Sequence, residues 1–208
     1  MKETEVTFRS GELTLEALLA NPAGDSRAAV VCHPHPMYGG SMYNNVVDAV
    51  LDGLWQAGYA TLRFNFRGVG ASEGEHDGGP GEVDDAIAAA TFLVSQPGVR
   101  KDGLIMAGYS FGAMVAVSAG YETAEIARIV AVALPLAMAD VRIPEGSSKP
   151  ILLVSGDRDS YSPVNGVRAL KEKIGDSARV EIVAGADHFF GGSEKEVARV
   201  IGELLKEH

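Results

Sequence analysis

Residues 104–112 read Leu-Ile-Met-Ala-Gly-Tyr-Ser-Phe-Gly, and residues 113–119 continue as Ala-Met-Val-Ala-Val-Ser-Ala. The apolar run predicts a buried strand over 103–109, and the residues after Ser110 predict a helix over 111–121. The Gly-x-Ser-x-Gly pattern between them is typical of a serine held on a tight, strained turn. Such a turn exposes the Ser110 hydroxyl above the sheet and places the N–H of Phe111 at a helix N-terminus. Because the chain has 25 glycines, an ordinary serine-capped turn is the alternative interpretation.

Strands and helices are expected to alternate outward from this turn. Residues 5–10 and 13–20 predict a hairpin. Further strands are expected at 28–32, 59–66, 128–134, 150–155 and 179–183, and further helices at 44–57, 81–95, 164–174 and 193–206. This alternation predicts a three-layer α/β fold whose sheet is mostly parallel and doubly wound, with the antiparallel hairpin at one edge. Residues 135–149 are too few for a separate lid domain, so 1–208 is expected to be one domain with an open groove.

Composition narrows the classes of partner. Hydrophobic residues make up 46% of the chain and charged residues 22%, as in soluble globular proteins. The net charge of -10 disfavours nucleic acids and anionic membranes, because an acidic surface repels phosphate groups. The charged start of the chain lacks the apolar core of a signal peptide, and no apolar run reaches the roughly 18 residues of a membrane span. The single cysteine, Cys32, cannot form an intrachain disulfide. We therefore expect a cytoplasmic protein, and the oligomeric state is not indicated.

A serine nucleophile needs a base, and the base needs an orienting acid. On an open α/β sheet of this kind, the three residues follow in the order Ser, acid, His. Two histidines follow Ser110 in the sequence, His188 and His208. His188 falls between the last expected strand and the last helix, whereas His208 ends the sequence, where fraying is expected. His188 is therefore the candidate base, and a loop histidine without a special role is the alternative interpretation.

The candidate acid lies in residues 156–163, which read Gly-Asp-Arg-Asp-Ser-Tyr-Ser-Pro. Asp159 should extend further over the end of the preceding strand, nearer the histidine. Asp157 is expected to brace the loop by accepting backbone N–H groups or by pairing with Arg158. Asp187 is adjacent to His188, and adjacent side chains usually diverge. Asp159 is therefore the predicted acid.

Further motifs carry a resemblance to a known family. Residues 32–41 read C-H-P-H-P-M-Y-G-G-S and are followed by Asn44-Asn45, residues 63–74 read R-F-N-F-R-G-V-G-A-S-E-G, and residues 187–190 read D-H-F-F. With the serine turn and the 156–163 loop, they resemble the α/β-hydrolases, and most closely the small lidless bacterial serine hydrolases and esterases with an H-P-H-P segment. The resemblance implies acyl transfer through Ser110, Asp159 and His188, without a metal or organic cofactor. Asn65 departs from the pattern, since many members have Asp there, in a segment that is usually structural.

The resemblance also implies a second oxyanion N–H donor beside Phe111, from the loop after the third strand. Alignment of H-P-H with the family's commoner H-G-x puts this donor at His35, with Met37 or Tyr38 as the alternative if the loop is longer. Candidate substrate-lining residues, which also suit ordinary loop packing, are Met37, Tyr38, Leu136, Met138, Tyr161, Phe189 and Phe190. They suggest a partly apolar site for a small-molecule, short-chain ester. A thioesterase, a peptidase and a non-catalytic binding protein of the same fold are the alternatives.

Other features favour plainer interpretations. His33 and His35 could bind a metal, but no further ligand with suitable spacing is visible nearby. Gly39-Gly40 is not followed by the Gly-Lys-Ser/Thr of a phosphate-binding loop. Cys32 ends a buried strand, where an inert core thiol is expected.

Overall fold

The computed structural model describes residues 1–22, 24–138, 141–144 and 146–206 of the chain. Within these residues, eight strands form one sheet in the order β1-β2-β4-β3-β5-β6-β7-β8. The strands are β1 (Thr4–Ser10), β2 (Leu13–Ala20), β3 (Ala28–Cys32), β4 (Ala60–Phe64), β5 (Leu104–Tyr109), β6 (Ile126–Val132), β7 (Ile151–Gly156) and β8 (Ala178–Val183). The helices are α1 (Asn45–Gln56), α2 (Pro80–Val94), α3 (Phe111–Glu122), α4 (Val164–Ile174) and α5 (Glu194–Lys206), with short 3₁₀ helices η1 (Pro36–Tyr38) and η2 (Gly175–Ser177).

Antiparallel pairing is confined to one edge of the sheet. The hairpin strands β1 and β2 pair antiparallel, and β2 pairs antiparallel with β4. The remaining neighbours in the sheet, β4-β3-β5-β6-β7-β8, all pair parallel. Every residue of β3, β4, β5 and β7 is buried, as expected of strands that are covered on both faces. The predicted fold class, a mostly parallel sheet with an N-terminal hairpin, is confirmed.

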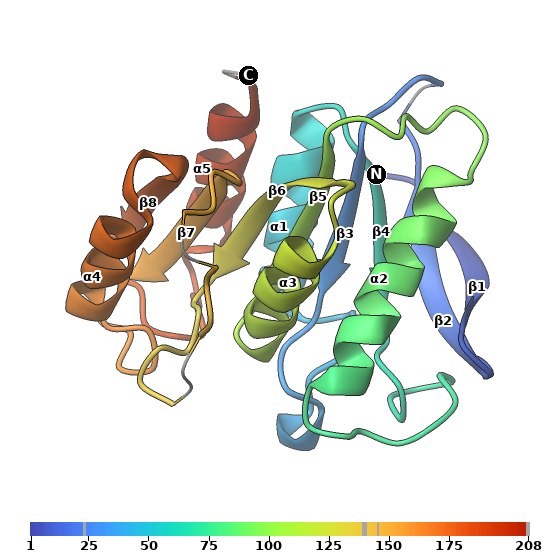
Figure 1. The fold of residues 1–208 in the computed structure, drawn as a ribbon, viewed down its shortest axis with the longest axis horizontal. Helices are drawn as coiled ribbons and strands as arrows, with labels where there is room; N and C mark the ends of the chain where they lie inside the picture. Colours follow the sequence, from blue (N-terminus) through green and yellow to red (C-terminus); the bar gives the residue numbers. More distant parts are fainter. Residues whose placement is uncertain (23, 139–140, 145, 207–208) are drawn as a thin grey trace.

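Helices cover both faces of the sheet and make three layers. In Figure 1, α2, α3 and α4 lie in front of the sheet, and α1 and α5 lie behind it. Strand β3 shows how the sequence supports this arrangement, because side chains alternate between faces along a strand. Ala29 and Val31 pack in the cluster formed with α1 and α5, whereas Val30 and Cys32 pack in the cluster formed with α2 and α3.

The chain reverses its direction of travel across the sheet at β3. This strand lies between β4 and β5, so the chain first moves to one side of β3 and then crosses to the other. It leaves β3 toward α1 on one face and leaves β5 toward α3 on the opposite face. The helices after these two neighbouring strands therefore lie on opposite faces, and such a point at the carboxyl edge of a sheet is where open α/β folds bind ligands.

The predicted strands and helices are all present, and the differences are local. The strand expected over 59–66 is Ala60–Phe64. The Asn65 N–H still bonds the Glu16 carbonyl of β2, and the chain leaves the sheet at Phe66, whose N–H turns to His33. The strand expected over 128–134 is Ile126–Val132, because Ala133 has a φ of 49° and cannot continue it. The two 3₁₀ helices were not predicted. The described part of 135–149 holds no helix or strand. Across the described ranges, no helix combines the length and the apolarity that a membrane crossing needs.

Candidate active site

Ser110 occupies the turn between β5 and α3 in a strained backbone conformation. Its φ is 56° and its ψ is -118°, which an L-residue adopts only where its surroundings enforce it. A Cβ atom at Gly108 would lie 2.0 Å from the Gly112 carbonyl oxygen, and one at Gly112 would lie 2.3 Å from the Cys32 carbonyl oxygen. The turn therefore needs glycine on both sides of the serine, and the Gly-x-Ser-x-Gly pattern reflects close backbone approach.

The three side chains predicted from the sequence meet in the structure. Ser110 Oγ lies 3.0 Å from His188 Nε2, and His188 Nδ1 lies 2.9 Å from Asp159 Oδ2. The Asp159 side chain is completely buried and His188 is 8% exposed. A carboxylate beside Nδ1 favours the tautomer with a proton on Nδ1. In that tautomer Nε2 is free to accept the hydroxyl proton of Ser110.

The acid loop holds Asp159 in one orientation. Its Oδ1 atom accepts the N–H groups of Tyr161 at 2.8 Å and Ser162 at 2.9 Å, which leaves Oδ2 for the imidazole. The two alternative acids are used elsewhere. Asp157 Oδ1 accepts the Gly185 N–H at 2.7 Å, and Asp187 Oδ1 accepts the Phe189 N–H at 2.9 Å, so both brace turns.

The loops after β7 and β8 place aromatic rings around His188. The rings of Tyr161 and Phe189 lie 4.7 and 5.6 Å from the imidazole, between ring centroids. Both residues are exposed, as expected for side chains that line an open site. Phe190 was also predicted to line the site, and this prediction is wrong. Its φ of 52° turns the side chain into the core, where it is fully buried in the cluster with α1 and α5.

The other predicted lining residues differ in their surroundings. The Tyr38 ring lies 5.0 Å from the His35 ring and is exposed, and Met37 is exposed beside it in η1. Met138 is exposed on the loop after β6, which is tied to the acid loop by a hydrogen bond from the Ala137 N–H to the Tyr161 carbonyl. Leu136 is half-buried and packs into the apolar cluster beneath α4, so it lines that cluster rather than an open surface.

The two backbone N–H groups predicted as oxyanion donors have no acceptor among the described residues. They belong to Phe111, at the N-terminus of α3, and to His35, in the loop after β3. The rings of these two residues lie 4.8 Å apart, so the two loops are in contact. The alternative donors are engaged, because the Met37 N–H bonds His35 Nδ1 and the Tyr38 N–H bonds the His35 carbonyl. Of the three candidates in this loop, His35 alone therefore has an N–H available.

His33 and Asn65 fix the loops that surround this site. His33 Nδ1 lies 2.6 Å from the Pro34 carbonyl oxygen, and Nε2 accepts the Phe66 N–H at 3.1 Å. Burial lowers the pKa of His33 to about 4. With both nitrogens engaged, His33 is not available to a metal, and no group of three or more His, Cys, Asp or Glu in the described ranges could hold one. Asn65 accepts the Met42 N–H and donates to Glu16, which is a structural role.

A second histidine–carboxylate pair lies beside His35 and was not predicted from the sequence. His76 Nδ1 lies 2.7 Å from Glu82 Oε1, and Glu82 is fully buried. The His76 ring lies 4.9 Å from His35 and 5.5 Å from Phe111. Burial and the neighbouring His76 lower the pKa of His35, so its imidazole stays neutral near pH 7. Nothing in the linear spacing of His35 and His76 predicts this contact, which depends on the loop between β4 and α2.

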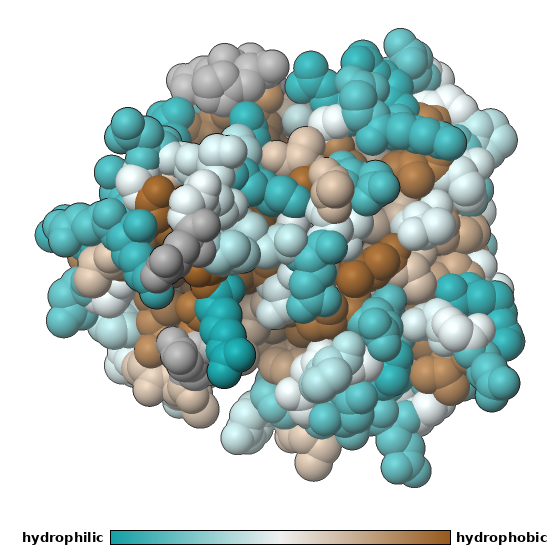
Figure 2. Space-filling model, in the orientation of Figure 1, coloured by the Kyte–Doolittle hydropathy of each residue, from teal (hydrophilic) through white to brown (hydrophobic). Residues whose placement is uncertain are grey.

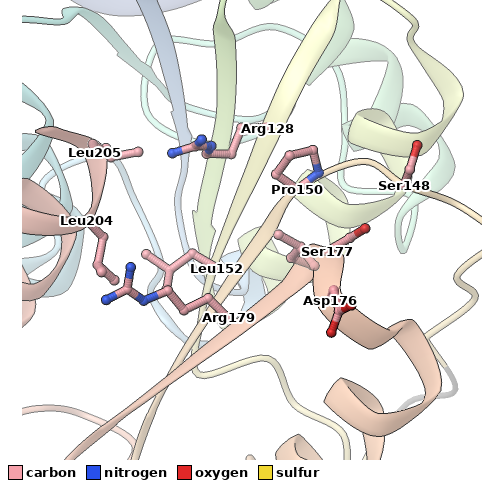
Figure 3. A pocket seen from close by; sticks show the side chains of 10 residues that line it. Arg128, Ser148, Pro150, Leu152, Asp176, Ser177, Arg179, Leu204 and Leu205 are labelled. Atoms are coloured by element: carbon pink, nitrogen blue, oxygen red, sulfur yellow. The ribbon is translucent and has the colours of Figure 1, made fainter. Parts of the chain in front are cut away.

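Two cavities of the structure are lined by neither Ser110 nor His188. One, of about 510 Å³, lies at the amino edge of β6, β7 and β8, where Arg128 and Arg179 approach Leu204 and Leu205 (Figure 3). The other, of about 450 Å³, lies between α2 and α3, where Figure 2 shows apolar surface. Its lining includes Val83, Met114 and Phe111. Ser110 and His188 therefore lie outside both of these cavities, and the nearby side chains of Tyr161 and Phe189 are exposed.

The buried thiol of Cys32 takes no part in this arrangement. It is completely buried beneath the carboxyl edge of the sheet, and burial raises the pKa of the thiol far above its ordinary value. A thiol held in its neutral form is unreactive as a nucleophile. This agrees with the prediction of an inert core residue.

Comparison with known proteins places this geometry in a family. An uncharacterized protein from Rickettsia prowazekii is 33% identical over 210 residues, which cover 97% of this chain and 88% of that protein. An alpha-beta serine hydrolase homologue from Coxiella burnetii superposes with a TM-score of 0.89 at 32% identity, over 99% of this chain and 98% of that one. A serine hydrolase without lid from Xanthomonas campestris gives a TM-score of 0.87 at 28% identity, over 100% and 95% of the two chains. Residues 28–203 match the family model of the alpha/beta hydrolase domain, and the chain therefore belongs to the α/β-hydrolase family.

Proposed function

We propose that the protein is a serine hydrolase that cleaves carboxylic esters through an acyl-enzyme on Ser110. The observation that carries the proposal is the pair of contacts at His188, one to the serine hydroxyl and one to a buried carboxylate. A nucleophile, a base and an orienting acid in hydrogen-bond reach are the arrangement that activates a serine. A non-catalytic binding protein would have no need of the strained backbone at Ser110.

The reaction follows from the proton positions. His188 Nε2 takes the proton of Ser110 as Oγ attacks the carbonyl carbon, and the imidazolium then donates that proton to the leaving alcohol. Water repeats the attack on the acyl-enzyme with His188 again as base, and this releases the carboxylic acid and restores Ser110. Asp159 keeps the ring oriented and stabilises its charged form throughout.

The tetrahedral intermediates carry a negative charge on the former carbonyl oxygen. The N–H groups of Phe111 and His35, both without an acceptor in the described structure, are suited to bind it. Each such donor is worth on the order of 3 kcal/mol of transition-state stabilisation. The N-terminus of α3 adds a favourable dipole at the same place.

The substrate class follows from the surroundings of Ser110. The surface there is open and rimmed by the exposed side chains of Tyr38, Tyr161 and Phe189. Such a surface suits small, short-chain acyl groups, because it offers little depth in which to bury a long chain. The relative from Xanthomonas campestris is likewise described as lacking a lid. Esters are the proposed substrates. Thioesters and amides are assayed in parallel, and a preference for either would change the proposed substrate class.

The test is hydrolysis of p-nitrophenyl acetate and butyrate, with a thioester and an aminoacyl amide in parallel. Ser110→Ala should lose roughly 10⁶-fold in kcat while the unfolding midpoint stays near that of the wild type. Ser118→Ala, on the same helix, is the matched control and should retain the wild-type rate. Wild-type turnover by folded Ser110→Ala would overturn the proposal, and a preference for the thioester or amide would change its substrate class.

A further inference from the structure

Tyr109 lies directly before the nucleophile and has no part in the mechanism above. It ends β5 and is 3% exposed, within the apolar cluster that includes Val132, Val154 and Val183. Its hydroxyl crosses this cluster to the base loop, where Oη lies 2.9 Å from the carbonyl oxygen of His188. The residue beside Ser110 in sequence is therefore hydrogen-bonded to the backbone of the residue that must deprotonate Ser110.

The hydroxyl of Tyr109 is suited to a permanent donor role. Burial, with the charges of Asp159 and Asp187 nearby, raises the pKa of Tyr109 above its ordinary value, so the phenol keeps its proton. A carbonyl oxygen accepts but cannot donate, so the direction of the hydrogen bond is settled. Removal of the hydroxyl would leave the buried side of the His188 carbonyl without this donor, at the cost of an unmade hydrogen bond.

The contact joins the end of β5 to the loop after β8. Ser110 follows β5 and His188 follows β8, and strands β6 and β7 lie between them. The base loop also contains a strained residue, since Phe190 has a φ of 52° two positions after His188. The ring of Tyr109 packs 5.6 Å from the His188 ring, between centroids. One side chain thus contacts both the backbone of His188, through its hydroxyl, and the imidazole of His188, through its ring.

We propose that Tyr109 is a positioning residue that holds His188 Nε2 in hydrogen-bond reach of Ser110 by donating its phenolic hydrogen to the His188 backbone carbonyl. The proposal rests on the proposed function, because it concerns the alignment of that base with that nucleophile. The second position of Gly-Tyr-Ser-Phe-Gly is then selected for its hydroxyl as well as for its ring.

The first test is Tyr109→Phe, which keeps the ring that packs in the core and removes the hydroxyl alone. Misalignment of the base should lower kcat by roughly ten- to a hundredfold with KM unchanged. The rate is taken per folded site, measured by near-ultraviolet circular dichroism. Tyr59→Phe is the matched control, because Tyr59 is buried in the same cluster just before β4, far along the chain from the site, and it should keep the wild-type kcat. If Tyr109→Phe does not fold, Tyr109→Met is measured against the same expectation.

The second test separates positioning from a general structural role. In a His188→Ala background there is no imidazole to align, so Tyr109→Phe should leave the residual rate unchanged. A wild-type kcat for Tyr109→Phe, or an equal fold loss in both backgrounds, would overturn the proposal. Ser110→Ala in the same assay distinguishes the two failures. If it is inactive, the proposed function stands whatever Tyr109 does, and if it has the wild-type rate, both proposals fall.

Discussion

Two aspartates of one loop, Asp157 and Asp159, bind different partners: Asp157 binds the backbone of a neighbouring turn, and Asp159 binds His188. Asp159 has one oxygen fixed by two N–H groups of its own turn and the other at His188 Nδ1. Asp157 points to the neighbouring turn and accepts the Gly185 N–H. The two residues have the same chemistry and both follow β7, so their roles differ because their side chains point in different directions.

This difference makes a matched pair of variants. Asp159→Asn should lower kcat by roughly 10³- to 10⁴-fold, because an amide in place of the carboxylate no longer favours the reactive tautomer of His188. Asp157→Asn keeps an oxygen that can accept the Gly185 N–H, so its kcat should stay within a few-fold of the wild type. Steady-state kinetics on one ester decides between them, and the reverse ranking would assign the acid to Asp157.

His33 gives the protein a pH-dependent stability. Its pKa is about 4 in the folded protein against an ordinary value of 6.5. Below about pH 6.5 the unfolded chain binds a proton that the folded protein does not, so the free energy of unfolding falls as the pH decreases, by about 3 kcal/mol in total by pH 4. Urea denaturation between about pH 7 and pH 4 measures the slope. His33→Gln should flatten it, and equal slopes for the two proteins would contradict this account.

At the scale of elements, the turn between β5 and α3 depends on how closely it approaches β3. The backbone of Gly112 touches the last carbonyl of β3, and a methyl group has no room there. Gly112→Ala should therefore lower the free energy of unfolding by at least about 2 kcal/mol. Gly191→Ala, where a Cβ atom would meet nothing within 4 Å, is the control and should change it by less than about 0.5 kcal/mol. Equal stability of the two variants in urea would show that the turn can relax.

Elements were predictable from sequence where local pattern and tertiary contact agree. The apolar run before Ser110 and the glycines around it predicted the strand, the turn and the helix. Strand ends were less predictable where a single residue turns the chain, as at Ala133 with its positive φ. Phe190 was misplaced for the same reason, because its direction is set by a backbone dihedral that composition does not reveal. The His35–His76 contact joins two loops that are far apart in the sequence and meet only in the folded structure, so no local pattern predicts it.

At the scale of the whole molecule, the order of the strands explains why the site lies where it does. At the reversal the chain leaves β3 and β5 toward opposite faces of the sheet, and the parallel strands bring the loops after β7 and β8 to the same edge. Chain order alone predicted that Ser110, Asp159 and His188 would share that edge. The resemblance also implied the N–H groups of Phe111 and His35 as oxyanion donors, but the sequence left Met37 and Tyr38 open as alternatives, and their hydrogen bonds within the loop are seen only in the structure. A cytoplasmic location and a small-molecule partner stay predictions from the sequence.

The open surface around Ser110 predicts a limit on substrate size. The kcat/KM for p-nitrophenyl esters should be highest for acetate or butyrate and should fall toward palmitate, because a long chain finds no deep pocket at the site. Without a lid, the rate should also show no jump when the substrate passes its solubility limit. A maximum at long chains, or such a jump, would indicate a chain-binding channel and would point to the cavity between α2 and α3.

The central claim is that His188 activates Ser110, and covalent labelling with a fluorophosphonate tests it most directly. The reagent reacts with an activated serine, and peptide mass spectrometry locates the adduct. We expect one adduct, on the peptide that contains Ser110, and we expect its rate of formation to fall by at least roughly 10³-fold in His188→Ala. An adduct on another serine, or an equal labelling rate in the wild type and His188→Ala, would contradict the account.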